Sequence, residues 1–370
     1  MTRHFLDAEH YRSSTTFDTE QRNIFGKLWI FVGFTFMVAA RNQFLTRTVA
    51  GIPVLVQQTD TGLRAFINQC PHRLSAIQTQ PHGKRPLVCP YHAWSFDSEG
   101  QLRGVPNEHL YGFNPQERKQ ICLRTLSLET IGPLIFINLD ADPAPLTEQF
   151  SSSFLEELNE AAAYLDDEII YSCHQVDYNW KLAMENVKDH NHVTFVHPKS
   201  FSPAVAALDH YCTAGAQPHI DELGCPPLQE LSYGASHPMV PRRPWFARHC
   251  ETYPDDKHYR NWFIYPNVNF CCVTGAHFLL QQYEPLSATQ TKCHVWIMTA
   301  RRYSTAPDFT ALLATLMRGE RTVIAEDTAV LEQMQRNMGA HSHGFTHGDY
   351  ETPLVKQHLW YRACVLGQTD

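Results

Sequence analysis

The sequence lacks several features that would mark whole classes of protein. Its longest apolar run, from Leu28 to Ala40, contains Gly33 and is short of the roughly 20 residues that a bilayer span requires. The polar start MTRHFLDAEHYRSSTTFD has no apolar stretch of the kind that marks a secretory signal. The net charge of −8 gives no basic excess that would attract phosphate backbones or anionic lipids. We therefore expect neither nucleic acid nor a membrane as a partner.

Two further features are missing. No Gly-x-Gly-x-x-Gly fingerprint occurs, so the sequence offers no recognisable site for direct binding of NAD(P)H. The 11 cysteines are odd in number and too sparse for a secreted disulfide scaffold, which favours a reducing compartment. We expect a cytoplasmic location, with cysteines that stay free or bind metal.

Turn signals divide the chain into two regions of different character. At 370 residues the chain is long enough for two domains. From about Phe44 to Asp140, short apolar runs alternate with turn residues, which predicts β-hairpins in a small all-β domain. Two prolines between Asp140 and Thr147 indicate a linker. The region beyond the linker mixes helical and strand patterns and reads as α+β.

Three elements of that second region matter for function. Residues 179–197 carry the pattern of one helix, and strands recur from Asn261 to Ala300. A last long helix is expected from about Pro307 to Met338, with an interruption near Gly319.

Two short motifs each combine a cysteine with a histidine. Cys70-x-His72 and Cys89-x-x-His92 are separated by sixteen residues and lie at the tips of predicted hairpins. A structural zinc site accepts the same ligand types. A Rieske 2Fe-2S cluster requires two cysteines on one iron and two histidines on the other. Because both motifs here are mixed, whereas zinc modules usually separate cysteines from histidines, the pattern favours the cluster, with zinc as the alternative.

A second group of metal-binding residue types lies in the segment 179–198. Glu185, Asp189 and His192 are spaced at i, i+4 and i+7, which would place them on one face of a continuous helix. His197 follows just before the helix-ending Pro198. Any one of these side chains would be unremarkable on a solvated face, but the group together indicates a metal site.

A carboxylate ligand is available in the last predicted helix. An apolar stripe at helical spacing is formed there by Val323, Asp327, Val330, Leu331 and Met334. A carboxylate within such a stripe is costly unless it meets a cation, whereas Glu326 lies to the flank. Two histidines and one carboxylate with open positions form the facial triad of non-haem Fe(II) oxygenases. We assign His192, His197 and Asp327 as Fe(II) ligands.

These motifs resemble those of the Rieske non-haem iron oxygenases, the family of aromatic-ring-hydroxylating dioxygenase alpha subunits. The resemblance extends from Ile24 to Gly367 and includes the segment CPHRLSAIQTQPHGKRPLVCPYHAWSF, an Asp-x-x-His-x4-His motif and a Glu-Asp-x4-Glu motif. It implies an α+β protein, with a small all-β Rieske domain and a larger helix-grip-like catalytic domain built on an antiparallel sheet. It also implies a 2Fe-2S cluster and an Fe(II) ion, held by Cys70, His72, Cys89 and His92 and by His192, His197 and Asp327.

The resemblance further implies domain bounds and an assembly. An N-terminal segment, 1–40, would pack on the catalytic domain, the Rieske domain would span 41–145, and the catalytic domain 146–370. In this family an acidic residue hydrogen-bonds a cluster histidine of the neighbouring subunit and an iron-bound histidine of its own. Asp189 would then link His92 of one chain to His192 of the next, in a cyclic homotrimer. The position of Asn186, three residues before Asp189, resembles the choline monooxygenase and carnitine oxygenase branch, where a glutamate usually takes the bridging place.

The expected activity is that of a terminal oxygenase. Such a subunit uses O2 and electrons from a separate NAD(P)H-dependent reductase, with or without a ferredoxin, to hydroxylate or oxidatively demethylate a small organic substrate. An aromatic acid, as in aromatic hydrocarbon catabolism, and a quaternary ammonium compound are both candidates. The alternative is a Rieske electron-transfer protein without oxygenase activity.

Substrate-binding residues are less clearly marked. Three arginines could hold a substrate carboxylate or could simply lie on the surface: Arg242, Arg243 and Arg248. Five aromatic residues could cage an ammonium group or could simply pack in a core: Phe201, Trp245, Phe246, Trp262 and Tyr265. A mobile loop, rather than a third metal site, is expected to hold His341, His343 and His347.

Overall fold

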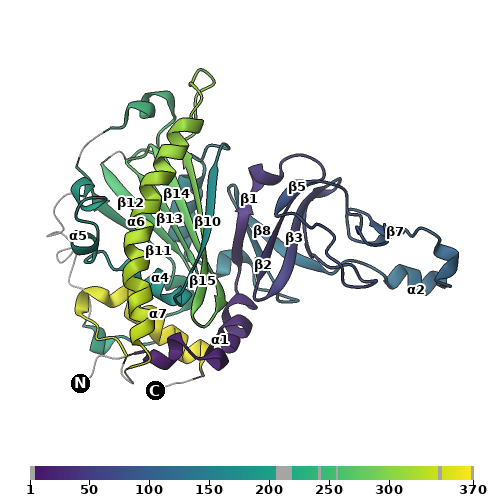
Figure 1. Cartoon of the computed structure of the whole chain (residues 1–370), viewed down its shortest axis with the longest axis horizontal. Coiled ribbons are helices and arrows are strands. Elements are labelled where there is room, and N and C mark those ends of the chain that lie inside the picture. The colour runs from purple at the N-terminus through teal and green to yellow at the C-terminus, as the bar shows by residue number, and fades with distance from the viewer. Residues whose placement is uncertain (1–4, 206–218, 241–242, 256, 341–343, 368–370) are drawn as a thin grey trace. The chain divides into compact units, whose positions relative to one another are not determined.

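The computed structural model describes all residues except 1–4, 206–218, 241–242, 256, 341–343 and 368–370. The chain divides into two compact units, one formed by Gln21–Leu146 and the other by Met1–Glu20 together with Thr147–Asp370. Figure 1 shows that the first is rich in strands and that helices cover a sheet in the second. The boundary at Leu146 falls within the predicted linker. Within the described ranges, no helix has the length and apolar character needed to cross a bilayer.

The unit of residues 21–146 is built on a seven-stranded antiparallel sheet. In spatial order its strands are β1 (Ile30–Phe34), β9 (Leu134–Asn138), β8 (Thr125–Ile131), β4 (Gly62–Ile67), β3 (Ile52–Thr59), β2 (Gln43–Val49) and β5 (His82–Lys84). A separate hairpin pairs β6 (Ser95–Phe96) with β7 (Leu102–Gly104), and one short helix, α2, spans Pro115–Gln120. The predicted β-hairpins are confirmed where β3 pairs with β4 across Asp60 and Gly62, and where β6 pairs with β7 across 97–100.

The N-terminal segment is divided between the two units. β1 pairs with β9, where Ile30 lies opposite Ile137, and the segment from Gln21 belongs to the β-rich unit. α1 (Ser14–Glu20) belongs to the other unit, where the fully buried Glu20 accepts a hydrogen bond from Trp180 Nε1 at 2.9 Å. The expectation that all of 1–40 packs on the catalytic domain therefore does not hold for residues 21–40, because the apolar run around β1 completes a sheet formed by strands far along the chain.

The second unit contains a six-stranded antiparallel sheet covered by helices. The strand order is β10 (Ile170–Val176), β15 (Gln290–Thr299), β14 (His277–Ser287), β13 (Val268–Val273), β12 (His258–Ile264) and β11 (Tyr233–Pro238). The helices are α3 (Ser152–Ala162), α4 (Trp180–Lys188), α5 (Val193–Val196), α6 (Thr310–Asn337) and α7 (Thr352–Trp360). α6 contacts β10 and β15, and α4 contacts β13 and β14. Figure 1 shows α6 running the length of one face of this sheet.

Two expectations for the helices were wrong. The helix predicted over 179–197 breaks after Lys188, because Asp189 adopts an extended ψ of 99° before α5 begins. By contrast, α6 continues through Gly319 over 28 residues. A single exposed glycine costs a helix only about 1 kcal/mol, which the packing of Leu313, Met317 and Ile324 against the unit outweighs.

Candidate metal centres

The two Cys-His motifs form a pair of loops with matching backbone geometry. In the first loop the Leu74 N–H donates to the Cys70 carbonyl at 2.9 Å, and in the second the Ala93 N–H donates to the Cys89 carbonyl at 3.0 Å. Leu74 and Ala93, each four residues after the cysteine, both have positive φ, 62° and 55°. Such backbone is unusual for residues with side chains, and its occurrence at equivalent places indicates that both loops are shaped for one purpose.

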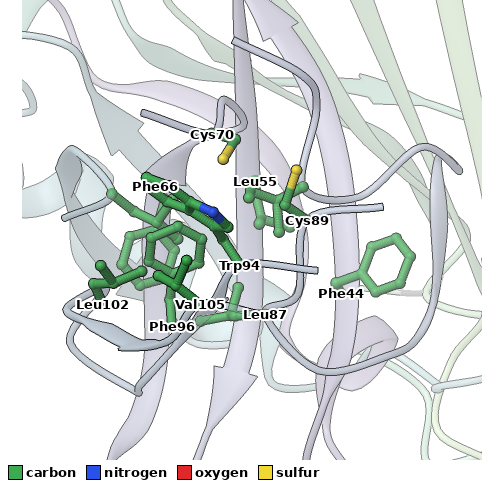
Figure 2. Packing of buried hydrophobic residues seen from close by; sticks show 12 residues of the cluster. Phe44, Leu55, Phe66, Cys70, Leu87, Cys89, Trp94, Phe96, Leu102 and Val105 are labelled. Carbon is green, nitrogen blue, oxygen red and sulfur yellow. The ribbon is translucent and has the colours of Figure 1, made fainter. Parts of the chain in front are cut away.

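The four side chains of these loops meet at the edge of an apolar cluster. Cys70 and Cys89 are 1% and 2% exposed, and Figure 2 shows both sulfur atoms on the same side of the Trp94 indole. The His72 and His92 rings lie 4.7 Å apart, and His72 stacks on Trp94 at 4.5 Å. Residues behind them include Phe44, Leu55, Phe66, Leu87, Phe96, Leu102 and Val105.

The electrostatics of the loops favour a bound metal group. Burial, and then contact with Cys89, raise the pKa of Cys70 to about 11. The Nδ1 atoms of His72 and His92 are both buried, without a hydrogen-bond partner among the described residues. A buried polar atom of that kind is costly unless it binds something. Two buried thiols beside two unpartnered imidazole nitrogens fit the two-cysteine, two-histidine requirement of a Rieske cluster.

The predicted triad comes together in the second unit. His192 and His197 flank the short helix α5, one immediately before it and one immediately after it, and Asp327 lies on α6. Asp327 Oδ1 is 3.4 Å from His192 Nε2 and 3.0 Å from His197 Nε2. One ligand atom from each residue lies within 4.8 Å of the other two. This is the one such group of three or more His, Cys, Asp or Glu residues in the described part of the chain.

Hydrogen bonds on the far side of each ring fix its tautomer. His192 Nδ1 bonds the Asp189 backbone carbonyl, and His197 Nδ1 lies 2.7 Å from Glu326 Oε2. A carbonyl or carboxylate oxygen only accepts, so each Nδ1 carries the hydrogen and each neutral ring directs its Nε2 lone pair at Asp327. Three lone pairs therefore converge on one point, and that arrangement requires a cation.

The pKa values of the triad residues fit a bound cation. Burial acts to raise the pKa of Asp327, but contacts with His192 and His197 outweigh it and lower the pKa to about 2. Burial likewise acts to lower the pKa of His197, while Asp327 and Glu326 raise it above its ordinary value. A divalent cation bound between these groups would compete with protons for the same atoms and release them.

Two acidic residues behave differently from expectation. Glu326, expected to lie on the flank of α6, accepts hydrogen bonds from both His197 Nδ1 and Ser200 Oγ, the second at 2.5 Å. Glu185, expected on one face with Asp189 and His192, instead accepts from Tyr11 OH at 2.8 Å and lies 2.9 Å from His358 Nε2. The break after α4 explains the second difference, because Glu185 and His192 no longer share a helix.

Asp189 occupies the turn between α4 and α5. Besides its carbonyl bond to His192, its carboxylate accepts from the Asn191 N–H at 2.9 Å and comes within 4.0 Å of His192 Nδ1. Burial raises the pKa of Asp189, against an opposing effect from His192. A cavity of about 190 Å³ adjoins it, with walls that also include Val330 and Glu351.

A second cavity, of about 240 Å³, opens directly beside the triad. Of the aromatic candidates, Phe201 lines it, together with Tyr259, which sequence reasoning missed. Trp262, Tyr265 and Phe246 lie in the core, and Trp245 is exposed, as are Arg243 and Arg248. None of these six residues lines the cavity, and Arg242 lies outside the described residues.

The histidine tract after α6 is only partly described. His341 and His343 lie outside the described residues. His347 lies in the irregular segment 344–348, where it is 4% exposed and its ring packs 5.0 Å from that of His358.

Comparison with known families agrees with these two centres. Residues 156–367 match the profile "Ring hydroxylating alpha subunit (catalytic domain)", which covers more than half of the chain. Residues 28–114 match the profile "Rieske [2Fe-2S] domain". The chain belongs to the ring-hydroxylating alpha-subunit family. It is a Rieske non-haem iron oxygenase, with a 2Fe-2S cluster and a catalytic mononuclear iron as cofactors, and the reading as a mere electron carrier is not supported.

Relatives of this Rieske oxygenase belong to two substrate groups. The carnitine monooxygenase oxygenase subunit of Acinetobacter baumannii is 28% identical over 335 residues, which cover 89% of this chain and 83% of the relative. The anthranilate 1,2-dioxygenase large subunit of Burkholderia cepacia is 33% identical over 202 residues, 50% of this chain and 46% of the relative. Oxygenase subunits of this family receive electrons from reductase or ferredoxin partners and form oligomers.

Solved structures confirm the predicted fold class. The quaternary ammonium Rieske monooxygenase CntA in complex with L-carnitine matches with a TM-score of 0.73 at 23% identity, covering 97% of this chain and 95% of that one. Naphthalene 1,2-dioxygenase from Rhodococcus sp. matches with a TM-score of 0.75 at 18% identity, covering 99% and 95%. The α+β architecture with a Rieske domain and a catalytic domain is therefore shared with both.

Proposed function

We propose that this chain is the terminal oxygenase subunit of a multicomponent Rieske system and that its sequence-predicted residues hold the two iron centres. In this proposal residues 21–146 form the Rieske domain, and the other unit forms the catalytic domain. The observation that carries it is the convergence of three lone-pair atoms, from His192, His197 and Asp327, beside a cavity large enough for a small organic substrate.

The residues around the triad have distinct tasks. The Asp189 carbonyl and the Glu326 carboxylate hold the two imidazoles in the tautomer that directs Nε2 inward. Asp327 supplies one negative charge, so a bound divalent ion keeps a net positive charge toward the cavity. His192, His197 and Asp327 would hold Fe(II) with positions left open, and the ion would supply the activation of O2. The cavity wall also includes the apolar residues Val323, Leu279 and Ile297, which offer contact surface to an organic substrate.

We further propose that electrons pass between subunits through Asp189. The carboxylate of Asp189 lines a cavity whose other walls include the exposed Val330, so a neighbouring chain has access to it. On that neighbour, His92 lies next to Tyr91, which is 59% exposed at its loop tip. Because the contact would join different surfaces of identical chains, it predicts a cyclic homotrimer. The electron source would be a separate NAD(P)H-dependent reductase, with or without a ferredoxin.

The proposed substrate is a small organic molecule that is hydroxylated or oxidatively demethylated. The relatives are named for carnitine, glycine betaine, anthranilate and 2-aminobenzenesulfonate. A quaternary ammonium compound and an aromatic acid are therefore the two classes that the proposal retains. The cytoplasmic location expected from cysteine usage stays a prediction.

The substitution Asp327→Ala tests the iron site. The variant should keep the visible spectrum of the cluster, lose about one iron per chain and lose substrate-dependent O2 uptake, because the remaining two histidines no longer form a triad. Glu332→Ala is the matched control, since this carboxylate lies on the same helix but contacts Asp177 N and Arg336 instead. An Asp327→Ala protein with unchanged iron content would contradict the assignment.

A further inference from the structure

The cavity beside the triad contains a second carboxylate, which the oxygenase chemistry described above does not use. Glu320 lies on α6, seven residues before Asp327, and both side chains line the same cavity. Seven residues are two helical turns, so the two residues share a face about 10.5 Å apart along the helix axis. A substrate between them would contact the iron site at one end and Glu320 at the other.

A chain of buried side-chain amides ends at Glu320. Asn261 on β12 donates through Nδ2 to Asn269 Oδ1 on β13 at 3.0 Å, and Asn269 Nδ2 donates to Gln281 Oε1 on β14 at 3.0 Å. Gln281 Nε2 then donates to Glu320 Oε1 at 2.9 Å. The three amide residues are 2%, 2% and 6% exposed.

The amide chain runs in one direction in the structure. Gln281 Oε1 accepts from both Asn269 Nδ2 and Tyr283 OH, and its amide nitrogen faces Glu320, whose carboxylate only accepts when it is ionised. Every amide therefore donates toward Glu320, and the aligned N–H groups favour its ionised form. Three strands are thus committed to holding a hydrogen-bonded carboxylate at the cavity wall.

Within the described cavity wall no lysine or arginine balances that charge. His192 and His197 line the cavity too, but in the proposed site their Nε2 atoms hold the metal. His277 and His190 also line it, but burial lowers the pKa of His277 to about 4 and holds the pKa of His190 well below its ordinary value, with a further lowering from His237 and His192. Both rings are therefore neutral at pH 7. Burial, together with the charge of Asp327, raises the pKa of Glu320 to about 7. A cation in the cavity would oppose this rise and favour the ionised carboxylate.

We propose that Glu320 is the specificity-determining residue of this pocket and that it selects substrates with a positively charged nitrogen over substrates with a carboxylate. An ammonium group supplies the charge that the amide chain and Glu320 lack, whereas a carboxylate is repelled by Glu320 and finds no arginine in the described wall. The rings of Phe201 and Tyr259, 5.1 Å apart in an edge arrangement, add aromatic surface for a cation. This inference rests on the proposed function in taking the cavity as the substrate site.

Ligand binding to the intact holoprotein tests this without turnover. The probes are choline, its neutral carbon isostere 3,3-dimethyl-1-butanol, and benzoate, each titrated anaerobically by calorimetry. Wild type should bind choline at least about tenfold more tightly than the isostere, because their shapes match and their charges differ. Glu320→Gln keeps an acceptor for Gln281 but should lose about tenfold or more in choline affinity. Its affinity for the isostere should change by less than about twofold, and it should bind benzoate more tightly than wild type does. Glu332→Gln on the same helix should match wild type.

The same ratio of choline to isostere affinity in wild type and Glu320→Gln would overturn the inference, as would a wild-type preference for benzoate. Iron and sulfide content, measured on the same samples, reports on the proposed function separately. A chain with no mononuclear iron would refute the iron assignment, while the charge preference of the cavity would still be read from the binding data.

Discussion

Removal of the Glu326 carboxylate should weaken iron binding, although Glu326 itself does not face the proposed iron position. The ring of His197 is 2% exposed, and its Nδ1–H meets Glu326 Oε2 at 2.7 Å. In Glu326→Ala that N–H stays buried without its acceptor, and the ring loses the contact that orients Nε2. Partners of this kind typically contribute a factor of about 10 to 100 in metal affinity, which corresponds to about 1.4 to 2.7 kcal/mol.

A graded set of variants measures this contribution. Glu326→Gln keeps an oxygen acceptor but removes the charge, so its loss should lie between those of wild type and Glu326→Ala. Ser200→Ala removes the hydroxyl that holds the same oxygen and should cost a few-fold at most. Glu332→Ala, at 29% exposure compared with 31% for Glu326, is the control.

The assay is anaerobic titration of Fe(II) into protein that keeps its cluster but has been stripped of mononuclear iron, in competition with a chelator. The cluster spectrum checks that each variant is folded. Equal iron affinity in Glu326→Ala and wild type would refute the argument that the hydrogen bond from His197 orients a ligand.

Three further predictions concern electron transfer and stability. Asp189→Asn should keep both metals yet slow electron delivery, with Glu351→Gln in the same cavity as control, and normal coupled turnover in Asp189→Asn would refute the bridge. Lys181→Met should lower the free energy of unfolding by about 3 to 5 kcal/mol, because Lys181 pairs with Glu20 at 2.5 Å in the core. Lys356→Met, which breaks the more exposed pair with Glu230, should lower it by less than about 1 kcal/mol. Equal losses for the two variants on chemical denaturation would contradict the importance of the buried pair. The folded-state pKa of Glu320 is raised from 4.5 to about 7, so its stabilising contribution is complete below pH 4.5 and is lost as the pH rises through 7. Metal-free Glu320→Gln should therefore gain stability relative to wild type between pH 4.5 and pH 8, by up to about 3 kcal/mol. A pH-independent difference in stability would argue against a buried ionisable group.

The sequence was most informative where chemistry is local. The Cys-His motifs lie within 23 residues of one another, from Cys70 to His92, and their spacing alone indicated a shared metal group. Asp327 was recognisable because a carboxylate interrupted an apolar helical stripe. His192 and His197 were recognisable as ligand types, although the helix that was expected to carry them is broken at Asp189. Periodicity shows which residues recur on a face, but it does not show where one helix stops and another begins.

Features that depend on long-range contacts were missed. β1 joins β9 more than a hundred residues away, so the division of the N-terminal segment was not visible in the local pattern. Glu326 was read as a flank residue because its role depends on the position of His197. The amide chain also spans three strands, although one signal was available: Asn269 is a polar residue in the otherwise apolar strand β13.

The most direct test of the two-centre account is the metal and sulfide content of the wild-type chain after anaerobic purification, read together with its visible spectrum. One Rieske cluster and one mononuclear site give about three irons and two labile sulfides per chain. Two irons with two sulfides would contradict the assignment of His192, His197 and Asp327, and zinc without sulfide would contradict the cluster.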